Sequence, residues 1–400
     1  MDTICRWNDG GRFLHSVQND MAALRKSGII AAMTNSKLTP DEQFMRMALW
    51  LAEKGLGKTS PNPMVGAVIV KNGRIIAKGY HHAFGKDHAE VDALKHAKED
   101  MAGATMYVTL EPCRHFGKTP PCTDAIIRNK IGKVIIGTAD PDPRMKGESV
   151  KLLKETGIET VVGVLETECR KLNEKYIKHR ATGLPWVTMK FAQTLDGRIA
   201  AADGSSRWVA SPGSLKIAHK LRAEHDAILA GINNVLIDNP ELTLRLVKGR
   251  SPTRIILDSR LRIPLDAKVL TNQAIAKTII ATTPAAPADK RAALDKMGIE
   301  ILAAPADADG HVDIKKLLKI LGERDISSVL VEGGGEVYTS FLRAGLVDKI
   351  VGIIAPKILG KGFDTIRDLG ITDINRALKV KFTRVYRSGE DIVVEGEVAS

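Results

Sequence analysis

The sequence predicts an α/β protein built from two domains in tandem. Short apolar stretches alternate with amphipathic stretches of helical length, and the alternation runs twice along the chain, interrupted by Thr-Gly-Leu-Pro at residues 182–185. Such alternation is typical of parallel strands covered by helices. A chain of 400 residues is also too long for one typical domain. We therefore expect a three-layer α/β/α domain over residues 38–183 and a second α/β domain over residues 184–400.

The composition limits the classes of function. Hydrophobic residues make up 44% of the chain, enough for sizeable cores, and aromatic residues make up 4%, which argues against stacking platforms for single-stranded nucleic acid. The formal charge of +12 favours an anionic partner such as a phosphorylated metabolite, a dinucleotide or RNA, without choosing among them. No apolar run approaches the roughly 18 residues of a membrane span, and the N-terminus lacks the order of a signal peptide. The four cysteines do not form a disulfide framework, which favours a reducing, cytoplasmic compartment.

The first helical pattern begins only at Thr39, which can cap a helix whose first turn contains Pro40. We expect residues 1–37 to be a disordered extension without chemistry, and Met33 is an alternative start of the chain. In the first domain we expect helices over residues 44–52, 88–98, 123–129 and 148–155, and strands over residues 65–70, 74–78, 105–110, 133–137 and 158–162. Asn72-Gly73 between the first two strands is the strongest short hairpin signal.

The second domain restarts the alternation after residue 185. We expect strands over residues 186–191, 254–258, 278–281 and 328–331, helices over residues 212–225, 288–297, 314–321 and 337–344, and a closing antiparallel pair over residues 380–386 and 391–398. Gly333, Gly334 and Gly335 follow one of these strands and precede a helix. Backbone N–H groups at such a turn can cradle a pyrophosphate. The turn is not G-x-G-x-x-G, and an ordinary tight turn explains the glycines about as well.

One group of residues in the first domain has the spacing of a metal site. His88 and Glu90 stand at an expected helix start, and Cys113 and Cys122 each follow a proline. One histidine and two cysteines fit zinc with one open position, and zinc deaminases combine His-x-Glu with a later Pro-Cys. Glu90 would take a proton from the activated water and pass it to the leaving ammonia. The alternatives are a structural zinc site, or a helix cap with unrelated core cysteines.

These motifs resemble a known family. His88-Ala89-Glu90, together with Pro-Asn-Pro-Met-Val-Gly at residues 61–66 and Thr-Leu-Glu-Pro-Cys at residues 109–113, is similar to the cytidine-deaminase superfamily. The eight residues between the cysteines resemble those of the bifunctional deaminase–reductase family of riboflavin biosynthesis. Residues 190–198 and 329–336 are similar to the reductase half, so the resemblance covers residues 38–398. Ser149 departs from the family, which usually has a second glycine there.

The resemblance implies the fold and the chemistry of both halves. A cytidine-deaminase-like domain with zinc would convert 2,5-diamino-6-(5-phosphoribosylamino)pyrimidin-4(3H)-one to 5-amino-6-(5-phosphoribosylamino)uracil. A dihydrofolate-reductase-like domain with NADPH would then reduce the ribosyl group to ribityl. The deaminase substrate contacts would be Asn62, His81, His115 and Lys118.

In the reductase half the resemblance implies two sets of contacts. NADPH would meet Ala192, Trp208, Asn234, Asp238, Ser259, Gly334, Gly335, Glu336, Val337, Tyr338, Thr339 and Ser340. The substrate would meet Ser206, Arg222, Leu242, Arg245 and Glu332, and the two guanidinium groups suit a phosphate because they can bind it bidentately. Lys190 and Asp238 are the candidates for proton transfer, with a structural ion pair between them as the alternative.

Two other classes of function remain open at this level. A tRNA or nucleotide deaminase with an accessory domain would use the same zinc chemistry, although the long loop between the cysteines and the few aromatic residues argue against it. A non-catalytic, zinc-stabilised regulator is the second alternative. We expect a phosphorylated pyrimidine as the substrate, no nucleic-acid or membrane partner, and a homo-oligomer, with a dimer favoured.

Overall fold

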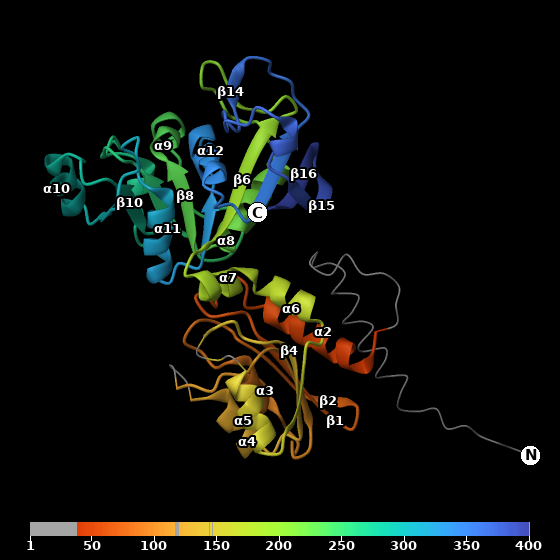
Figure 1. Cartoon of the computed structure of the whole chain (residues 1–400). Coiled ribbons are helices and arrows are strands. Elements are labelled where there is room, and N and C mark those ends of the chain that lie inside the picture. Colours follow the sequence, from red (N-terminus) through yellow and green to blue (C-terminus); the bar gives the residue numbers. More distant parts are fainter. Residues whose placement is uncertain (1–37, 117–119, 144, 146, 400) are drawn as a thin grey trace, which may run out of the picture. The chain divides into compact units, whose positions relative to one another are not determined.

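The computed structural model describes residues 38–116, 120–143, 145 and 147–399 (Figure 1). The expectations for residues 1–37, including Met33 as a start, and for Lys118 lie outside the described residues. The chain divides into two compact units, one ending at Asn173 and one beginning at Glu174. Each unit is described here by itself.

The first unit is built on a sheet whose described strands follow the order β2-β1-β3-β4-β5. These are β1 (Gly66–Lys71), β2 (Arg74–Tyr80), β3 (Thr105–Leu110), β4 (Lys133–Thr138) and β5 (Glu159–Val162). β1 is antiparallel to β2 and β3, whereas β3, β4 and β5 run parallel. The predicted hairpin is confirmed: Asn72 and Gly73 both have positive φ, which a two-residue turn of this kind requires.

Helices cover both faces of this sheet. They are α2 (Pro40–Glu53), α3 (Ala89–His96), α4 (Cys122–Arg128), α5 (Glu148–Glu155) and α6 (Glu166–Leu172). A Cβ on Gly66 would lie 1.9 Å from the Ala48 carbonyl oxygen of α2, and a Cβ on Gly79 would lie 2.5 Å from the Ala89 carbonyl oxygen of α3. Gly79 pairs with Ala67, the neighbour of Gly66, so the two glycines face opposite sides of the sheet. Figure 1 shows α2 and α6 on one side and α3, α4 and α5 on the other, which confirms the three-layer prediction.

The second unit contains a larger sheet with the described order β11-β10-β9-β8-β12-β6-β13-β16-β15. Its strands are β6 (Trp186–Thr194), β8 (Ala227–Gly231), β9 (Thr253–Leu257), β10 (Thr278–Thr282), β11 (Glu300–Ala303), β12 (Ser328–Val331), β13 (Lys349–Ala355), β15 (Val380–Ser388) and β16 (Asp391–Val398). The strands from β11 to β13 are parallel, and the β15–β16 hairpin is antiparallel. The neighbouring strands β8, β12 and β6 therefore all end at the same edge of the sheet.

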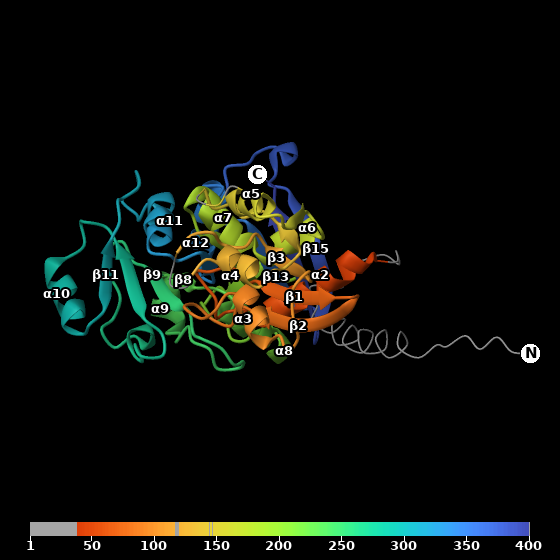
Figure 2. The same ribbon diagram turned by 90° about the horizontal axis from the view of Figure 1, so that it is seen from below.

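Helices also cover both faces of the large sheet. They are α7 (Glu174–Thr182), α8 (Pro212–Ala223), α9 (Ile232–Asp238), α10 (Ala288–Lys296), α11 (Ile314–Glu323) and α12 (Gly335–Arg343), with η1 (Lys268–Leu270) and η2 (Ile374–Arg376) as single 3₁₀ turns. Ala227 and Leu229 face the core under α11 and α12, and Ile228 and Ala230 face the core under α9 and α10. Figure 2 shows α9 and α11 on opposite sides of β8 and β9. This period-two burial makes β8 apolar on both faces.

A small second sheet extends from the carboxyl edge of the large one. β7 (Arg198–Ala201) follows β6 and pairs antiparallel with β14 (Gly362–Asp364), which follows β13. Every helix and strand that the pattern predicts is present, with bounds shifted by a few residues. The pattern did not predict α6, α7, α9, β7, β8, β11, β13 and β14. None of the helices in the described ranges is long and apolar enough to cross a bilayer.

Two candidate active sites, one in each unit

The first site brings together the three predicted metal ligands. His88 is the N-cap of α3, Cys122 is the first residue of α4, and Cys113 follows the end of β3. His88 Nδ1 lies 3.4 Å from Cys113 Sγ and 3.3 Å from Cys122 Sγ, and the three ligand atoms all lie within 4.8 Å of one another. One imidazole nitrogen and two sulfurs at this spacing fit a zinc ion that keeps a fourth position open.

The surroundings favour a thiolate at Cys113. The Cys122 amide, at the start of α4, donates to Cys113 Sγ over 3.3 Å. A hydrogen bond from the Cys122 side chain, followed by one from His88, lowers the pKa of Cys113 to about 4. Thiolates are the form of cysteine that binds metal, and helix starts stabilise them. The protein therefore supplies the negative charge that a zinc ion needs.

Glu90 is buried beside these ligands. It is the second residue of α3 and is 3% exposed. Burial raises the pKa of Glu90, and its carboxyl group is hydrogen-bonded with the Cys122 side chain. A buried carboxylate that is not one of the three clustered ligands matches the expected role in proton transfer.

Two of the predicted substrate contacts join the site, His81 directly after β2 and Asn62 from the loop before β1. His81 is 2% exposed, and its ring meets the His88 ring edge-on at 5.4 Å. Its Nδ1 donates to the Asp87 carbonyl over 2.8 Å, so its Nε2 accepts from the Asn62 amide at 3.2 Å. Burial lowers the pKa of His81, which keeps this ring neutral. His115 is exposed in the loop after Cys113.

Ser149, the departure from the family pattern, contacts the strand that leads to Cys113. Its hydroxyl is buried and donates to Glu111 Oε1 over 2.5 Å, and the Asp140 amide donates to Glu111 Oε2 over 3.1 Å. Glu111 thus ties α5 and the segment before it to the Glu-Pro-Cys residues that follow β3. Ser149 supplies half of this connection.

The second site lies at the carboxyl edge of the large sheet, where ligands bind in open α/β folds. Lys190 of β6, Arg222 of α8 and Glu332 after β12 form a buried cluster. Arg222 donates from Nε and Nη2 to the two oxygens of Glu332 over 2.7 and 2.9 Å. Lys190 Nζ lies 3.9 Å from Glu332 Oε2. Sequence reasoning named all three residues but not this pairing.

Charges within the cluster compensate for its burial. Burial alone would raise the pKa of Glu332, but the charges of Arg222 and Lys190 outweigh it and lower that pKa. Burial lowers the pKa of Lys190, although Glu332 opposes the effect. Lys190 therefore holds its proton less tightly than an exposed lysine. Asp238, the other predicted proton carrier, instead accepts from Ser206 Oγ over 3.0 Å.

Three of the predicted substrate contacts differ in how far their side chains are already bonded to, or buried in, the protein. The Arg222 fork is taken up by Glu332, and its Nη1 donates to the Thr243 carbonyl. The Arg245 guanidinium is about half exposed and lies 3.0 Å from Glu241 Oε2. Leu242 is 5% exposed and its side chain belongs to the core under α9 and α10. A ligand contact at Leu242 would therefore have to come from its backbone.

The predicted cofactor residues of α12 have structural partners of their own. The Tyr338 hydroxyl donates to the Lys190 carbonyl over 2.7 Å, Thr339 Oγ1 donates to Gly335, Ser340 donates to Glu336, and Glu336 pairs with Arg367. A Cβ on Gly335 would lie 2.5 Å from the Asp364 carbonyl oxygen, and one on Gly334 would lie 2.8 Å from Asn234 Oδ1. Close packing therefore explains part of the glycine run, independently of a cofactor.

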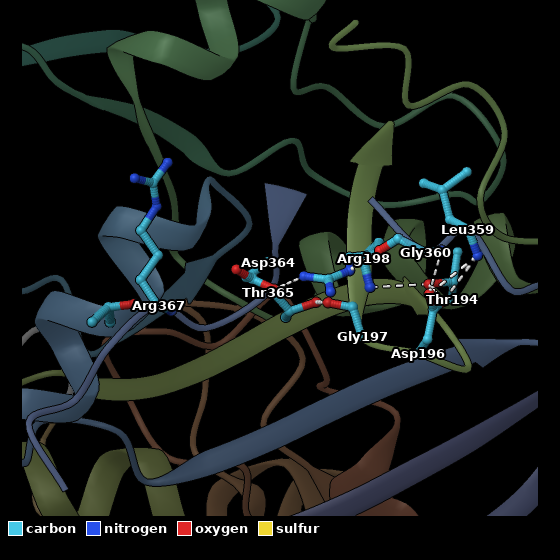
Figure 3. Close-up of polar contacts among 10 residues, drawn as sticks. Thr194, Asp196, Gly197, Arg198, Leu359, Gly360, Asp364, Thr365 and Arg367 are labelled. Atoms are coloured by element: carbon cyan, nitrogen blue, oxygen red, sulfur yellow. Dashed lines mark hydrogen bonds and ion pairs between the residues drawn. The ribbon is translucent and has the colours of Figure 1, made fainter. Parts of the chain in front are cut away.

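The other predicted cofactor contacts lie in different parts of the second unit. Val337 and Ala192 pack at the edges of hydrophobic cores, Trp208 is 65% exposed, and Ser259 Oγ accepts from the Val312 amide. The sequence indicates a turn at the end of residues 190–198 but not the contacts that hold it, which Figure 3 shows. Asp196 accepts from the Leu359 and Gly360 amides, and Arg198 pairs with Asp364. An Asp-Gly dipeptide between two strands was the available signal.

Fold and sites define the class of protein as a zinc-dependent deaminase joined to an α/β reductase. Residues 38–138 match the family model of the cytidine and deoxycytidylate deaminase zinc-binding region, and residues 185–394 match that of the RibD C-terminal domain. The riboflavin biosynthesis protein RibD of Aquifex aeolicus is 48% identical over 355 residues, which cover 88% of this chain and 97% of the relative. RibD of Escherichia coli is 38% identical over 368 residues, which cover 88% of this chain and 98% of the relative.

Solved structures agree. The diaminohydroxyphosphoribosylaminopyrimidine deaminase/5-amino-6-(5-phosphoribosylamino)uracil reductase of Thermotoga maritima is 41% identical, with a TM-score of 0.79 over 90% of this chain and 99% of that one. RibD of Acinetobacter baumannii is 35% identical, with a TM-score of 0.83 over 91% of this chain and 100% of that one. The chain belongs to the RibD family, the bifunctional deaminases and reductases of riboflavin biosynthesis. Its cofactors are zinc and NADPH, and its two domains have the predicted cytidine-deaminase-like and dihydrofolate-reductase-like folds.

Proposed function

We propose that this chain converts 2,5-diamino-6-(5-phosphoribosylamino)pyrimidin-4(3H)-one to 5-amino-6-(5-phosphoribosylamino)uracil and then reduces the ribosyl group of that product to ribityl. The convergence of His88, Cys113 and Cys122 beside buried Glu90 carries the first step. The Thermotoga maritima relative, whose description names these two activities, supports the pair of substrates. The deaminase domain spans residues 38–183 and the reductase domain residues 184–400, after an extension over residues 1–37.

In the deaminase half, the chain's own contribution is to hold the metal and to move protons. His88, Cys113 and Cys122 would hold zinc, which when bound supplies an acidified water. Glu90 takes one proton from that water, and its raised pKa lets it keep the proton until the amine leaves. Glu90 then protonates the amine, so water adds to the ring carbon and ammonia departs. Asn62, His81, His115 and Lys118 contact the substrate.

In the reductase half, bound NADPH would supply a hydride for C1 of the ring-opened sugar, and the chain would supply a proton to the adjoining nitrogen. Lys190 is the proton donor that the electrostatics favour, because burial lowers its pKa. Glu332 and Arg222 fix its position and balance its charge. Asp238 is the second candidate for proton transfer, acting through Ser206.

The contacts of the reductase half follow the family. The substrate meets Ser206, Arg222, Leu242, Arg245 and Glu332, with Arg245 on its phosphate. NADPH meets Ala192, Trp208, Asn234, Asp238, Ser259 and the residues from Gly334 to Ser340. The half-exposed guanidinium of Arg245 supports its role, since such a fork binds phosphate bidentately.

A coupled assay on the intact protein tests both steps. NADPH absorbance is followed after addition of the diaminopyrimidine substrate and, separately, of the deaminated intermediate. Glu90→Gln should stop NADPH oxidation from the first compound and leave it unchanged from the second, with zinc content unaltered. Oxidation from the first compound at the wild-type rate would contradict the role of Glu90.

We also propose that the chain acts in the cytoplasm as a homodimer. Three free cysteines among the described residues, two of them zinc ligands, suit a reducing compartment. β15 is the outer strand of the large sheet, and Ile374, Phe382 and Val385 nearby are 84%, 65% and 59% exposed. Exposed apolar residues on an edge strand favour pairing with a second copy. Sedimentation of the wild type as a monomer would contradict this, and Phe382→Asp should weaken a dimer.

A further inference from the structure

The backbone of residues 241–245 is held by side chains from three directions. Arg254 of β9 donates to the Glu241 carbonyl over 3.3 Å, and Arg222 of α8 donates to the Thr243 carbonyl over 3.1 Å. The Arg245 amide donates to His219 Nδ1 over 3.1 Å. Alternate residues of this segment are therefore fixed through their main chain, while the Arg245 side chain stays about half exposed.

His219 is suited to this contact because its ring is neutral. It is 5% exposed and lies one helical turn before Arg222, on the same face of α8. Its Nδ1 accepts a hydrogen bond, so its proton is on Nε2. Burial, followed by the charges of Arg222, Arg245 and Lys190 and opposed by Glu332, lowers the pKa of His219 to about 4. The ring therefore stays an acceptor at neutral pH.

Without His219 Nδ1 as an acceptor, the backbone of residues 241–245 would be released at Arg245. The Arg245 amide would be left without its partner, and its surroundings are partly buried, so the backbone would move to find another. A guanidinium whose backbone moves loses the alignment that bidentate phosphate binding needs. The bonds to Arg254, Arg222 and Ser251 Oγ act on residues 241, 243 and 244, so they hold the segment up to Leu244 and leave the amide of Arg245 to His219.

We propose that His219 is a positioning residue of the reductase, which fixes the backbone of Arg245 so that its guanidinium is aligned with the substrate phosphate. This inference rests on the proposed role of Arg245. It assigns to His219 no contact with the reacting atoms. The role predicts an effect on substrate affinity with little effect on turnover.

The first test compares His219→Leu with His219→Asn, whose side-chain oxygen can accept the same hydrogen bond. His219→Leu should raise the KM of the reductase for the deaminated intermediate about five- to tenfold and change kcat less than about twofold. His219→Asn should restore most of the KM, and deamination should be unchanged in both. His225→Leu is the matched control, because His225 is also buried on this side of the sheet but bonds to Leu221 and Thr188.

The second test is a double-mutant cycle with Arg245→Ala. If His219 acts through Arg245, adding His219→Leu to Arg245→Ala should raise the KM no further. Additive effects, or a fall in kcat at constant KM, would overturn the inference. A normal KM in Arg245→Ala alone would overturn the role of Arg245 and this inference with it. Wild-type protein that does not oxidise NADPH would instead refute the proposed function.

A third measurement does not depend on activity. Hydrogen exchange at the Arg245 amide should be slow in the wild type and in His219→Asn, and faster in His219→Leu. Unchanged protection in His219→Leu would show that the amide does not depend on His219, and would overturn the inference even in a protein without reductase activity.

Discussion

The zinc site and the reductase cluster differ in how their side chains are held. The zinc ligands lie between His88 and Cys122, and two of the three stand where a helix begins, so local backbone geometry aims them. The reductase cluster joins Lys190, Arg222 and Glu332, which come from β6, α8 and the end of β12 and hold one another. A substitution in the first site should remove one function cleanly. A substitution in the second should disturb its neighbours as well.

The largest expected effect separates the two halves. Cys122→Ser should abolish stoichiometric zinc binding and lower deamination more than about a hundredfold, because even partners outside the ligand shell change metal affinity or activity 10- to 100-fold. Reduction of the deaminated intermediate should continue at the wild-type rate. Metal analysis and the two assays provide the measurement. Cys169→Ser, at another buried cysteine, is the control and should keep its zinc.

The next effect tests whether the reductase cluster holds itself together. Glu332→Gln would leave the buried Arg222 and Lys190 without their anion, and breaking a buried pair costs about 3 kcal/mol or more of the free energy of unfolding. Denaturant unfolding of the intact chain measures this. Glu300→Gln breaks the exposed pair with Arg324 and should cost less than about 1 kcal/mol. Equal losses of unfolding free energy in the two variants would contradict the claim that Lys190, Arg222 and Glu332 hold one another.

The lowered pKa of His219 makes the free energy of unfolding depend on pH. Its pKa falls from an ordinary value of 6.5 to about 4 in the folded chain. Between these values the unfolded chain binds more protons at this residue than the folded chain, so its contribution to stability is present above pH 6.5 and is lost as the pH falls towards 4. The difference in free energy of unfolding between wild type and His219→Asn should shift in favour of the variant over this range. A difference independent of pH would contradict the neutral ring.

The smallest expected effect lies near the zinc site. Ser149→Ala would leave Glu111 Oε1 without its buried donor, which costs about 1–2 kcal/mol. The loss should appear as earlier thermal unfolding of the deaminase unit, with only a modest fall in zinc affinity because no ligand is touched. Ser205→Ala, which removes an exposed hydroxyl, serves as the comparison. A large loss of zinc would show that Glu111 does more than connect two segments.

The same contrast explains how much could be predicted from the sequence. Thr39, Asn72 and Gly73 act within a few residues, so the helix start and the hairpin could be predicted from local chemistry, and a capping box between Thr39 and Glu42 is present. The zinc ligands could be predicted although His88 lies 25 and 34 residues from the two cysteines, because His-x-Glu and a later Pro-Cys are short motifs of zinc deaminases. β8 was missed because its sequence, Ala-Ile-Leu-Ala-Gly, contains two alanines and a glycine, which are depleted in strands, whereas the equally buried β10 and β12 contain more β-branched residues.

The contacts within the reductase cluster could be seen only in the folded sheet. β12 lies between β6 and β8, and no local pattern indicates that parallel order. From the sequence, an ion pair between Lys190 and Asp238 was the alternative to a role of both in proton transfer, whereas the carboxylate beside Lys190 in the structure is that of Glu332. The same limit hid His219, because only the return of residues 241–245 to α8 gives it a role.

Arg254 has a further consequence, for the response to ionic strength. Its side chain is fully buried, and its guanidinium donates to the carbonyl oxygens of Glu241, Thr271 and Ala276. The charge of Arg254 is itself enclosed by protein, where dissolved ions cannot reach it, whereas exposed pairs such as Arg324 with Glu300 are screened over about 10 Å at 0.1 M salt. The anchor of residues 241–245 should therefore keep its strength in concentrated salt, where the surface pairs of the same domain no longer contribute.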